Sequence, residues 1–174
     1  YGFYYFSTFE ELRELASESY DSITGANYAG SDVLEIKEDI SLPDNFALWM
    51  EEGSLYIPSG VTFAAQKAVQ VGQMTVDGTA NVMRLTIYDS LEVNGKLVSS
   101  DIISMEKGAA LTGEDNIAFT QEWGSVHRTY EVTDIISLKQ TITRINDNVN
   151  SRRSYSIDFV GDVVITETVT IPAF

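Results

Sequence analysis

The stretch SLYIPSGVTF, residues 54–63, contains two short alternations of apolar and polar residues separated by turn-forming residues. Leu55 and Ile57 form the first alternation, and Val61 and Phe63 form the second. Alternation with a period of two places apolar side chains on one face of a β-strand and polar ones on the other. The intervening Pro-Ser-Gly favours a sharp corner, because glycine tolerates the positive φ that tight turns need. We therefore expect two strands joined at a corner.

This corner recurs along the chain at a nearly constant spacing. Glycines separated by 18, 17 and 18 residues mark it at Gly60, Gly78, Gly95 and Gly113. A second corner, with spacings of 19, 17 and 19 residues, is marked by Gly53, Gly72, Asp89 and Gly108. The aligned segments read GSLYIPSG, GQMTVDG, DSLEVNG and GAALTG. Self-similarity at a fixed period is typical of stacked repeats.

Each repeat contains three apolar pairs with strand alternation. In the three clearest repeats the pairs are Leu55/Ile57, Val61/Phe63, Val69/Val71, Met74/Val76, Ala80/Val82, Leu85/Ile87, Leu91/Val93, Leu97/Ser99 and Ile103/Met105. A further set lies upstream, at Leu34/Ile36, Ile40/Leu42 and Phe46/Leu48. Three short strands per turn of about 18 residues predict a mostly β fold, a single-stranded parallel β-helix (solenoid). Equivalent residues of successive coils then share one apolar column, at Leu34, Leu55, Met74 and Leu91.

An antiparallel β-sandwich is the alternative fold. Its support is the dipeptides DG at 77–78 and NG at 94–95, which are also hairpin signals. The nearly constant period favours the β-helix.

A short amphipathic helix is expected before the first coil. STFEELRELASESY places Ser7 and Glu10 at the spacing of a capping box and predicts a helix over about 8–20. Such a helix would cover the open end of the first coil, where strand edges and apolar core need protection. The same leader returns 126 residues later, and the matching positions are Phe6/Val132, Ser7/Thr133, Phe9/Ile135 and Leu12/Leu138. It predicts a second capping helix over about 134–149.

The coil after the leader is duplicated as well. YSIDFVGDVVITETVTIP corresponds to DVLEIKEDISLPDNFALW with an offset of 123 residues. We interpret residues 1–125 as a helix-capped β-helix module, and residues 126–174 as a second helix leader plus the first coil of a following, truncated module. The alternative is that residues 126–174 form a C-terminal cap of the first module. VTIPAF parallels LYIPSG and favours continuation.

The negative charge of the chain argues against some classes of binding partner. Lysine and arginine number 11 against 26 acidic residues, for a formal net charge of −15. This charge repels phosphate backbones and anionic lipid, so we expect no nucleic-acid binding. No apolar run approaches the roughly 18 residues that span a bilayer, so we expect no membrane insertion of this segment. The absence of cysteine excludes disulfides and thiolate chemistry.

No catalytic or metal-binding motif is found. His127 is the only histidine, and without cysteine it does not form a typical zinc site, so we expect a surface or junction residue. Carboxylates such as Glu51 and Asp158 fall at corners or outward positions. TGEDN, residues 112–116, lacks the spaced acidic pattern of a calcium loop. We expect no catalytic residue, no metal and no cofactor.

Four aromatic residues are candidate ligand contacts. Tyr56 and Tyr88 point outward if the alternating aliphatic residues point inward, and Trp49 and Trp123 lie near turns. Exposed aromatic rings stack on sugars and often mark binding surfaces. The tryptophans also have a structural interpretation, Trp49 as a plug of its coil and Trp123 as packing beneath the junction of the modules.

With its helix leader, its DISLP and VTIPAF strands and its GSLYIPSGVTF coil, the chain resembles bacterial extracellular parallel β-helix proteins. These are related in architecture to pectin-lyase-like folds and occur in surface proteins and adhesins. The resemblance implies secretion or attachment to the cell surface. The basic and calcium-ligating residues that polysaccharide lyases of this fold place along one face have no match here.

These observations favour a non-catalytic surface or secreted module, a stalk or adhesin-type segment that presents a face to a glycan or to a host or surface protein. The alternative is a fragment of a polysaccharide-active enzyme, of lyase or glycosidase type. A spacer without a ligand is a third hypothesis. Clustered acids with an arginine or lysine in a groove would favour the enzyme, and scattered serine, threonine and glutamate favour the module. The pattern makes no prediction of oligomeric state.

Overall fold

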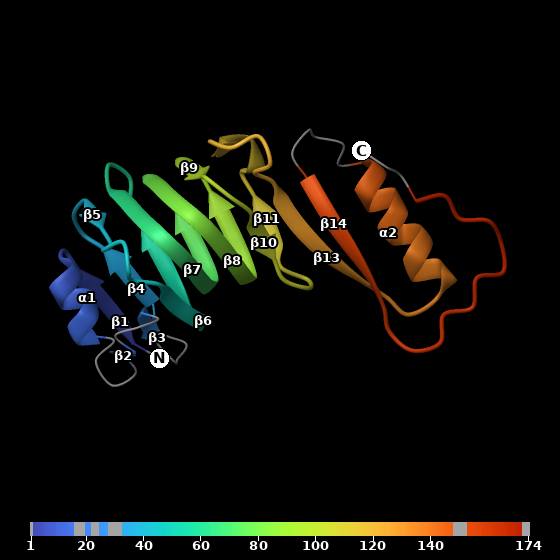
Figure 1. The fold of residues 1–174 in the computed structure, drawn as a ribbon, viewed down its shortest axis with the longest axis horizontal. Coiled ribbons are helices and arrows are strands. Elements are labelled where there is room, and N and C mark those ends of the chain that lie inside the picture. Colours follow the sequence, from blue (N-terminus) through green and yellow to red (C-terminus); the bar gives the residue numbers. More distant parts are fainter. Residues whose placement is uncertain (1, 16–19, 22–24, 28–32, 148–152, 172–174) are drawn as a thin grey trace.

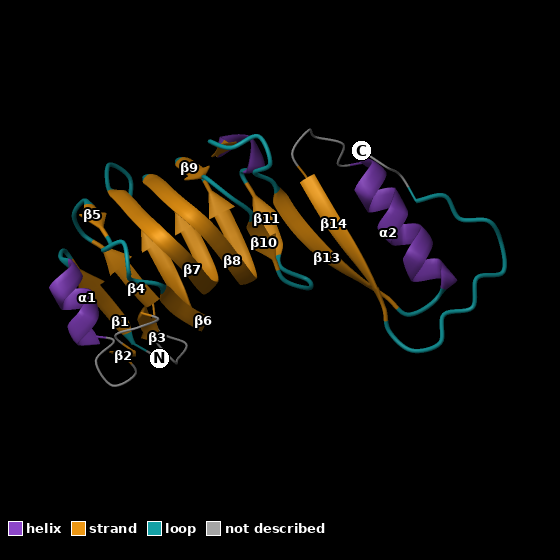
Figure 2. Ribbon diagram, viewed as in Figure 1, coloured by secondary structure: helices purple, strands orange, loops and turns teal. Residues whose placement is uncertain are grey.

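The chain folds into a stack of β-coils that follow one another along one axis (Figure 1). The structure is a computed structural model and describes residues 2–15, 20–21, 25–27, 33–147 and 153–171. It is a parallel β-solenoid of about five turns of about 20 residues each. The two α-helices lie toward opposite ends, and the strands fill the middle (Figure 2). The predicted mostly β, parallel β-helix fold is confirmed.

The elements follow the predicted coils closely. The first part of the chain forms β1 (Phe3–Phe6), α1 (Phe9–Leu15), β2 (Tyr20–Asp21), β3 (Gly25–Asn27), β4 (Val33–Ile36), β5 (Ile40–Ser41), β6 (Leu48–Ile57), β7 (Thr62–Val76) and β8 (Thr79–Val93). The second part forms β9 (Lys96–Ser99), β10 (Ile103–Met105), β11 (Ala110–Thr112), the 3-10 helix η2 (Glu114–Asn116), β12 (Ile117–Phe119), β13 (Val126–Val132), α2 (Ile135–Asp147) and β14 (Arg153–Phe159). The long strands β7 and β8 bend around the corners of the coil, with register shifts at the bends.

Each full coil contributes to three faces of parallel strands. The first face is made of residues 3–6, 33–36, 54–57, 73–76, 90–93 and 110–112. The second face is made of residues 40–41, 62–65, 79–82, 96–99 and 117–119. The third face is made of residues 26–27, 48–50, 68–71, 84–87, 103–105, 126–128 and 153–155. The third face therefore runs without a break from the first coils into β13 and β14.

The interior of the stack is built from columns of equivalent residues. One column on the first face runs through Leu34, Leu55, Met74, Leu91 and Leu111, at spacings of 21, 19, 17 and 20 residues. All the predicted inward residues are buried except Val61, which is half-buried. Burial of one such aliphatic side chain contributes roughly 1.5–3 kcal/mol, and the contribution recurs in every coil.

The antiparallel sandwich is wrong for this chain. Neighbouring coils pair in parallel throughout the three faces, and among the described strands only β2 and β3 pair antiparallel. The DG and NG dipeptides form corners between the first and second faces, where the backbone continues in the same rotational sense instead of reversing.

Close approach between coils explains the glycine series at this corner. A Cβ atom on Gly95 would collide with the carbonyl oxygens of Gly78 and Asp77, and one on Gly78 would collide with the carbonyls of the coil before it. The backbone N–H of Gly95 instead donates to Val76 O at 2.8 Å. Gly60 differs, because it has open space around it but a φ of +81°. Gly113 combines both needs, with a φ of +74° and no room for a Cβ atom beside Val93 O. The series therefore has a conformational reason at Gly60 and Gly113 and a steric one at Gly78, Gly95 and Gly113.

The helix α1 lies at the N-terminal end of the stack (Figure 1). Leu12 is fully buried, and the ring of Phe9 meets Phe46 edge to face, with centroids 4.8 Å apart. Its capping box is displaced by one residue from the prediction. Thr8 Oγ1 accepts from the backbone N–H of Glu11 at 3.3 Å, and Glu11 Oε2 accepts from the N–H of Ser7 at 2.7 Å.

The predicted helix over 8–20 is too long at its end. The helix ends at Leu15, residues 16–19 lie outside the described residues, and Tyr20–Asp21 form β2. The predicted helix over 134–149 agrees with α2, apart from 148–149, which are also outside the described residues. Asp134 caps α2 by accepting from the N–H of Ser137 at 2.7 Å. The two capping residues, Thr8 and Asp134, keep the 126-residue offset of the sequence repeat.

The duplicated sequence forms the same unit twice. In β1–α1–β4 the two strands pair in parallel with Phe6 opposite Ile36, and in β13–α2–β14 Val132 lies opposite Phe159. The surroundings differ, because β6 covers β4, whereas β13 is the only described strand that pairs with β14. Ile36 is fully buried, but its counterpart Phe159 is 50% exposed. The division into modules at residues 125 and 126 stays a prediction.

The corner contacts predict a difference between two glycines. Gly95→Ala should lower the free energy of unfolding by about 1–3 kcal/mol, because the new methyl group overpacks the neighbouring turn. Gly60→Asn should cost less than about 1 kcal/mol, because asparagine tolerates the left-handed region and the site is open. Urea unfolding followed by circular dichroism measures both. Equal costs at the two positions would contradict the close packing of the turns.

Candidate functional site

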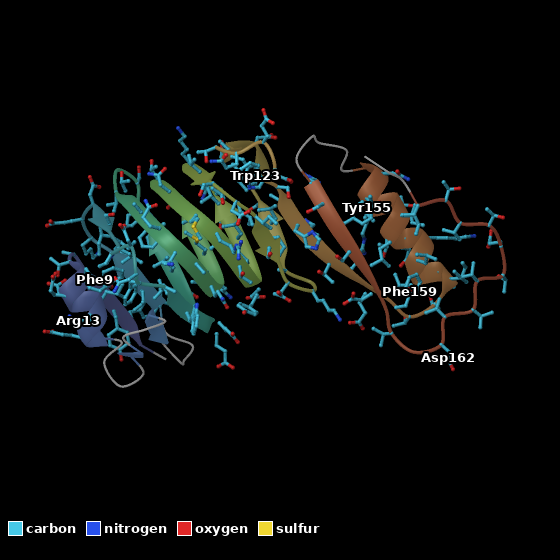
Figure 3. The ribbon with its side chains drawn as sticks, in the orientation of Figure 1. Phe9, Arg13, Trp123, Tyr155, Phe159 and Asp162 are labelled. Atoms are coloured by element: carbon cyan, nitrogen blue, oxygen red, sulfur yellow. The ribbon has the colours of Figure 1, made fainter. Side chains whose placement is uncertain are left out.

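The four predicted aromatic residues do not form one site. Trp49 lies on the third face, Tyr88 at the corner that leads from the third face to the first, and Tyr56 on the first face. Trp123 lies in the loop between β12 and β13 and is 68% exposed (Figure 3). Trp49 and Tyr88 have Gln70 as a common neighbour.

Tyr56 belongs to a hydrogen-bonded ladder that crosses coils. Its hydroxyl donates to Asp77 Oδ2 at 2.7 Å, and Asn94 Nδ2 donates to Asp77 Oδ1 at 2.9 Å. The hydrogen bonds from Asn94 and from Tyr56 lower the pKa of Asp77 below its usual range. The bond to Asp77 raises the pKa of Tyr56. The hydroxyl of Tyr56 thus serves to link two adjacent coils.

Tyr88 is the centre of a second outward cluster. Its hydroxyl donates to Gln70 Oε1 at 3.0 Å and to Glu51 Oε1 at 3.2 Å, on the two preceding coils. The strand between Tyr88 and Glu51 contributes Gly72 at this corner, where a Cβ atom would collide with the backbone carbonyls of Glu51 and Gly53. Burial, followed by the charge of Glu51, raises the pKa of Tyr88 to about 12. The phenol therefore stays protonated in neutral solution.

Trp49 extends this cluster along the third face. It lies opposite Gln70 in the strand register, and its side chain is half-buried. Its Nε1 is buried and has no hydrogen-bond partner. We name Trp49, Glu51, Gln70 and Tyr88 the Trp-Tyr cluster. It combines two aromatic rings with a carboxylate and an amide, a composition that suits contact with hydroxyl-rich ligands.

A hollow that the sequence did not predict lies between the corner after β10, strand β13 and helix α2. Its volume is about 360 Å³, and its lining residues are Met105, Glu106, Gly108, Ala109, Arg128, Thr129, Tyr130, Glu131, Thr141 and Arg144. Glu106 also acts on Tyr88, because its charge contributes to the raised pKa of that phenol. The hollow and the Trp-Tyr cluster are thus neighbours. The available signal in the sequence was strand alternation, which puts Arg128 on the same side of β13 as the buried Val126 and Val132.

His127 lies on the junction between β13 and β14. Its Nδ1 is 2.7 Å from Ser154 Oγ, and its Nε2 is 3.1 Å from Ser156 Oγ. Both ring nitrogens therefore engage hydroxyl groups of the adjacent strand. This arrangement ties the two strands together and agrees with the expected junction role.

The described part of the chain holds neither a preformed metal cluster nor a helix that could span a membrane. No group of three or more histidine, aspartate or glutamate side chains there is placed to hold a metal ion. Among the same residues, none of the helices has the length and apolar character needed to cross a bilayer.

Comparison of the chain with known protein families, with curated proteins and with solved structures found no match. The parallel β-solenoid architecture is consistent with the predicted β-helix fold, and the resemblance to a bacterial family stays a prediction.

The Asp77 ladder predicts a pH-dependent contribution to stability. Asp77→Asn should lower the free energy of unfolding at pH 7 by about 0.5–1 kcal/mol, the range for a solvent-accessible charge-assisted contact. Because folding lowers the pKa of Asp77, its contribution is present above the unfolded-state pKa, near 3.9, and is lost as pH falls through the folded-state value.

Urea unfolding of both proteins at pH 7 and at about pH 2.5 measures this change. The difference between wild type and Asp77→Asn should shrink at the lower pH. Glu38→Gln, at an exposed bend, is the control and should show little difference at either pH. A difference for Asp77→Asn that does not change with pH would contradict the role of the carboxylate.

Proposed function

We propose that the chain is a non-catalytic β-solenoid module of a secreted or surface protein of bacterial type, a stalk or adhesin-type segment that binds a glycan or a protein. The observation that carries the proposal is the bonding of outward polar side chains to one another across coils. Tyr56, Asp77 and Asn94 form one such ladder. Gln73 Nε2 donates to Asp89 Oδ2 at 2.5 Å in another. These groups stiffen the stack and are not directed at a reacting centre.

The stack geometry supports a stalk. Each coil adds one strand spacing, about 4.8 Å, to the length, and each repeat contacts mainly its neighbours. The exposed apolar residues of the second unit support its continuation. Phe159 and Ile165 are 50% and 53% exposed, whereas the positions matching them in the first unit, Ile36 and Leu42, are 0% and 1% exposed. We propose that a further coil covers them, as β6 covers β4.

The Trp-Tyr cluster is the proposed binding surface. Its half-buried tryptophan and tyrosine offer apolar ring area beside Glu51 and Gln70, which supply hydrogen-bond acceptors. Neutral sugars match this combination, because their rings present C–H groups to aromatic faces and their hydroxyl groups donate hydrogen bonds. The net charge of −15 disfavours an acidic polymer on this surface.

A polysaccharide-active enzyme remains the second candidate, and one observation favours it. The hollow holds Glu106 and Glu131 beside Arg128 and Arg144, a mixture of acids and bases. Against this use, Glu131 is bound by Lys107, with Nζ 3.2 Å from Oε2. An assay for released reducing ends on plant and bacterial polysaccharides tests it directly.

Glycan-array binding tests the favoured function. Trp49→Ala and Tyr88→Ala should each weaken binding at least tenfold, which equals about 1.4 kcal/mol and is typical of an aromatic anchor. Trp123→Ala, at the exposed ring outside the cluster, is the matched control and should bind as the wild type does. Circular dichroism melting of each variant checks that the fold is kept.

Two other outcomes would contradict the proposed binding surface or the proposed function. Loss of binding in Trp123→Ala but not in Trp49→Ala would move the binding surface to the β12–β13 loop. Failure of the wild type to bind any glycan, and failure to capture a protein in a pull-down, would leave only the spacer hypothesis.

A further inference from the structure

We infer that the hollow beside α2 binds a small oxyanion, a carboxylate or phosphate-type group, through the guanidinium of Arg128. The inference does not depend on the glycan-binding proposal. It rests on where Arg128 lies in the stack and on what surrounds its side chain.

Arg128 occupies a position that is aliphatic in the coils before it. The strand register continues one interior column through Val71, Ile87, Met105 and Arg128. The first three side chains are between 0% and 2% exposed. A guanidinium that follows them is partly withdrawn from water, and this withdrawal is unfavourable unless the charge and its donors are paired.

One donor of Arg128 lacks a partner within the described part of the chain. Its Nε is buried and has no hydrogen-bond partner. Neither of the carboxylates that line the hollow, Glu106 and Glu131, forms an ion pair with it, and Glu131 contacts Lys107 instead. The site therefore has an unmet demand for an acceptor.

A neighbouring arginine shows how the same fold pairs such a group. Arg153 ends the adjacent interior column, after Ile103 and Val126. Its Nε also lacks a partner, but its Nη2 forms an ion pair with Glu114 of η2. Among the described residues no carboxylate pairs with Arg128 in this way; its neighbour on β14 is Tyr155, and the hollow lies between β13 and α2.

The size and lining of the hollow define the ligand. A volume of about 360 Å³ lies at the lower end of the range for small-molecule sites, about 300–1,000 Å³. Arg144 adds a second guanidinium to the lining, and Thr129, Tyr130 and Thr141 add hydroxyl groups. Guanidinium groups bind carboxylates and phosphates through two parallel hydrogen bonds. The nearby glutamates and the net charge of −15 favour a small anion over a long polyanion.

Thermal unfolding and calorimetric titration at constant ionic strength test the site. The probes are acetate, galacturonate, phosphate and sulfate, with chloride as the reference ion. At least one oxyanion should raise the melting temperature of the wild type above its value in chloride and give a measurable heat of binding. A response to the carboxylates alone assigns a carboxylate ligand, and a stronger response to phosphate and sulfate assigns a tetrahedral one.

Two variants separate binding from folding. Arg128→Met continues the column as Met105 does, so it should melt at the wild-type temperature or higher in chloride and bind the oxyanion at least tenfold more weakly. Arg84→Met removes an exposed arginine that pairs with Asp101 and should keep the full response. Identical melting of the wild type in all five salts would overturn the inference, as would an undiminished response in Arg128→Met.

Discussion

The structure depends on the parallel stacking of equivalent residues at the spacing of one strand. Adjacent strands lie about 4.8 Å apart, so each side chain lies beside the one at its own position in the next coil, as Leu55 lies beside Met74 and Met74 beside Leu91. An interior position must therefore be apolar in every coil, or it disrupts its neighbours on both sides. The same spacing brings successive turns together, and at Gly95 it leaves no room for a side chain.

The sequence predicts most features that follow from this repetition. The column through Leu34 and Met74, the corner glycines and the parallel pairing could all be read from spacing and alternation. Features that depend on a single contact were harder to predict from the sequence. Ser7 and Thr8 are both good capping residues, so the sequence did not decide between them. The hydrogen bond of Tyr88 to Glu51 spans two coils and bypasses the coil between them, so it is a property of three coils together.

The two copies of the β–α–β unit have similar sequences but different surroundings, so comparing them shows which features of burial come from each. Phe6 and Val132 are both buried, and Leu12 and Leu138 are both buried, so the unit itself folds alike in each copy. The exposure of Phe159 follows from what lies beside β14, not from its sequence. In a stack, each coil is stabilised by the next one, and the stability of the last coil is lower for that reason.

Two arginines, Arg128 on β13 and Arg153 on β14, lie where the aliphatic interior of the stack gives way to polar residues. Interior columns that are aliphatic through Ile103 and Met105 continue into Arg153 and Arg128. A guanidinium covered by another aliphatic layer would lose its hydration, and the residue that follows Arg128 in the register is the half-buried Tyr155 and not an aliphatic one. The helix α2 lies at this point and presents Thr141 and Arg144 to the hollow in place of a further layer of aliphatic side chains. The hollow thus lies beside the point where an aliphatic column meets a charge, at Arg128, and Tyr155 follows it in the register.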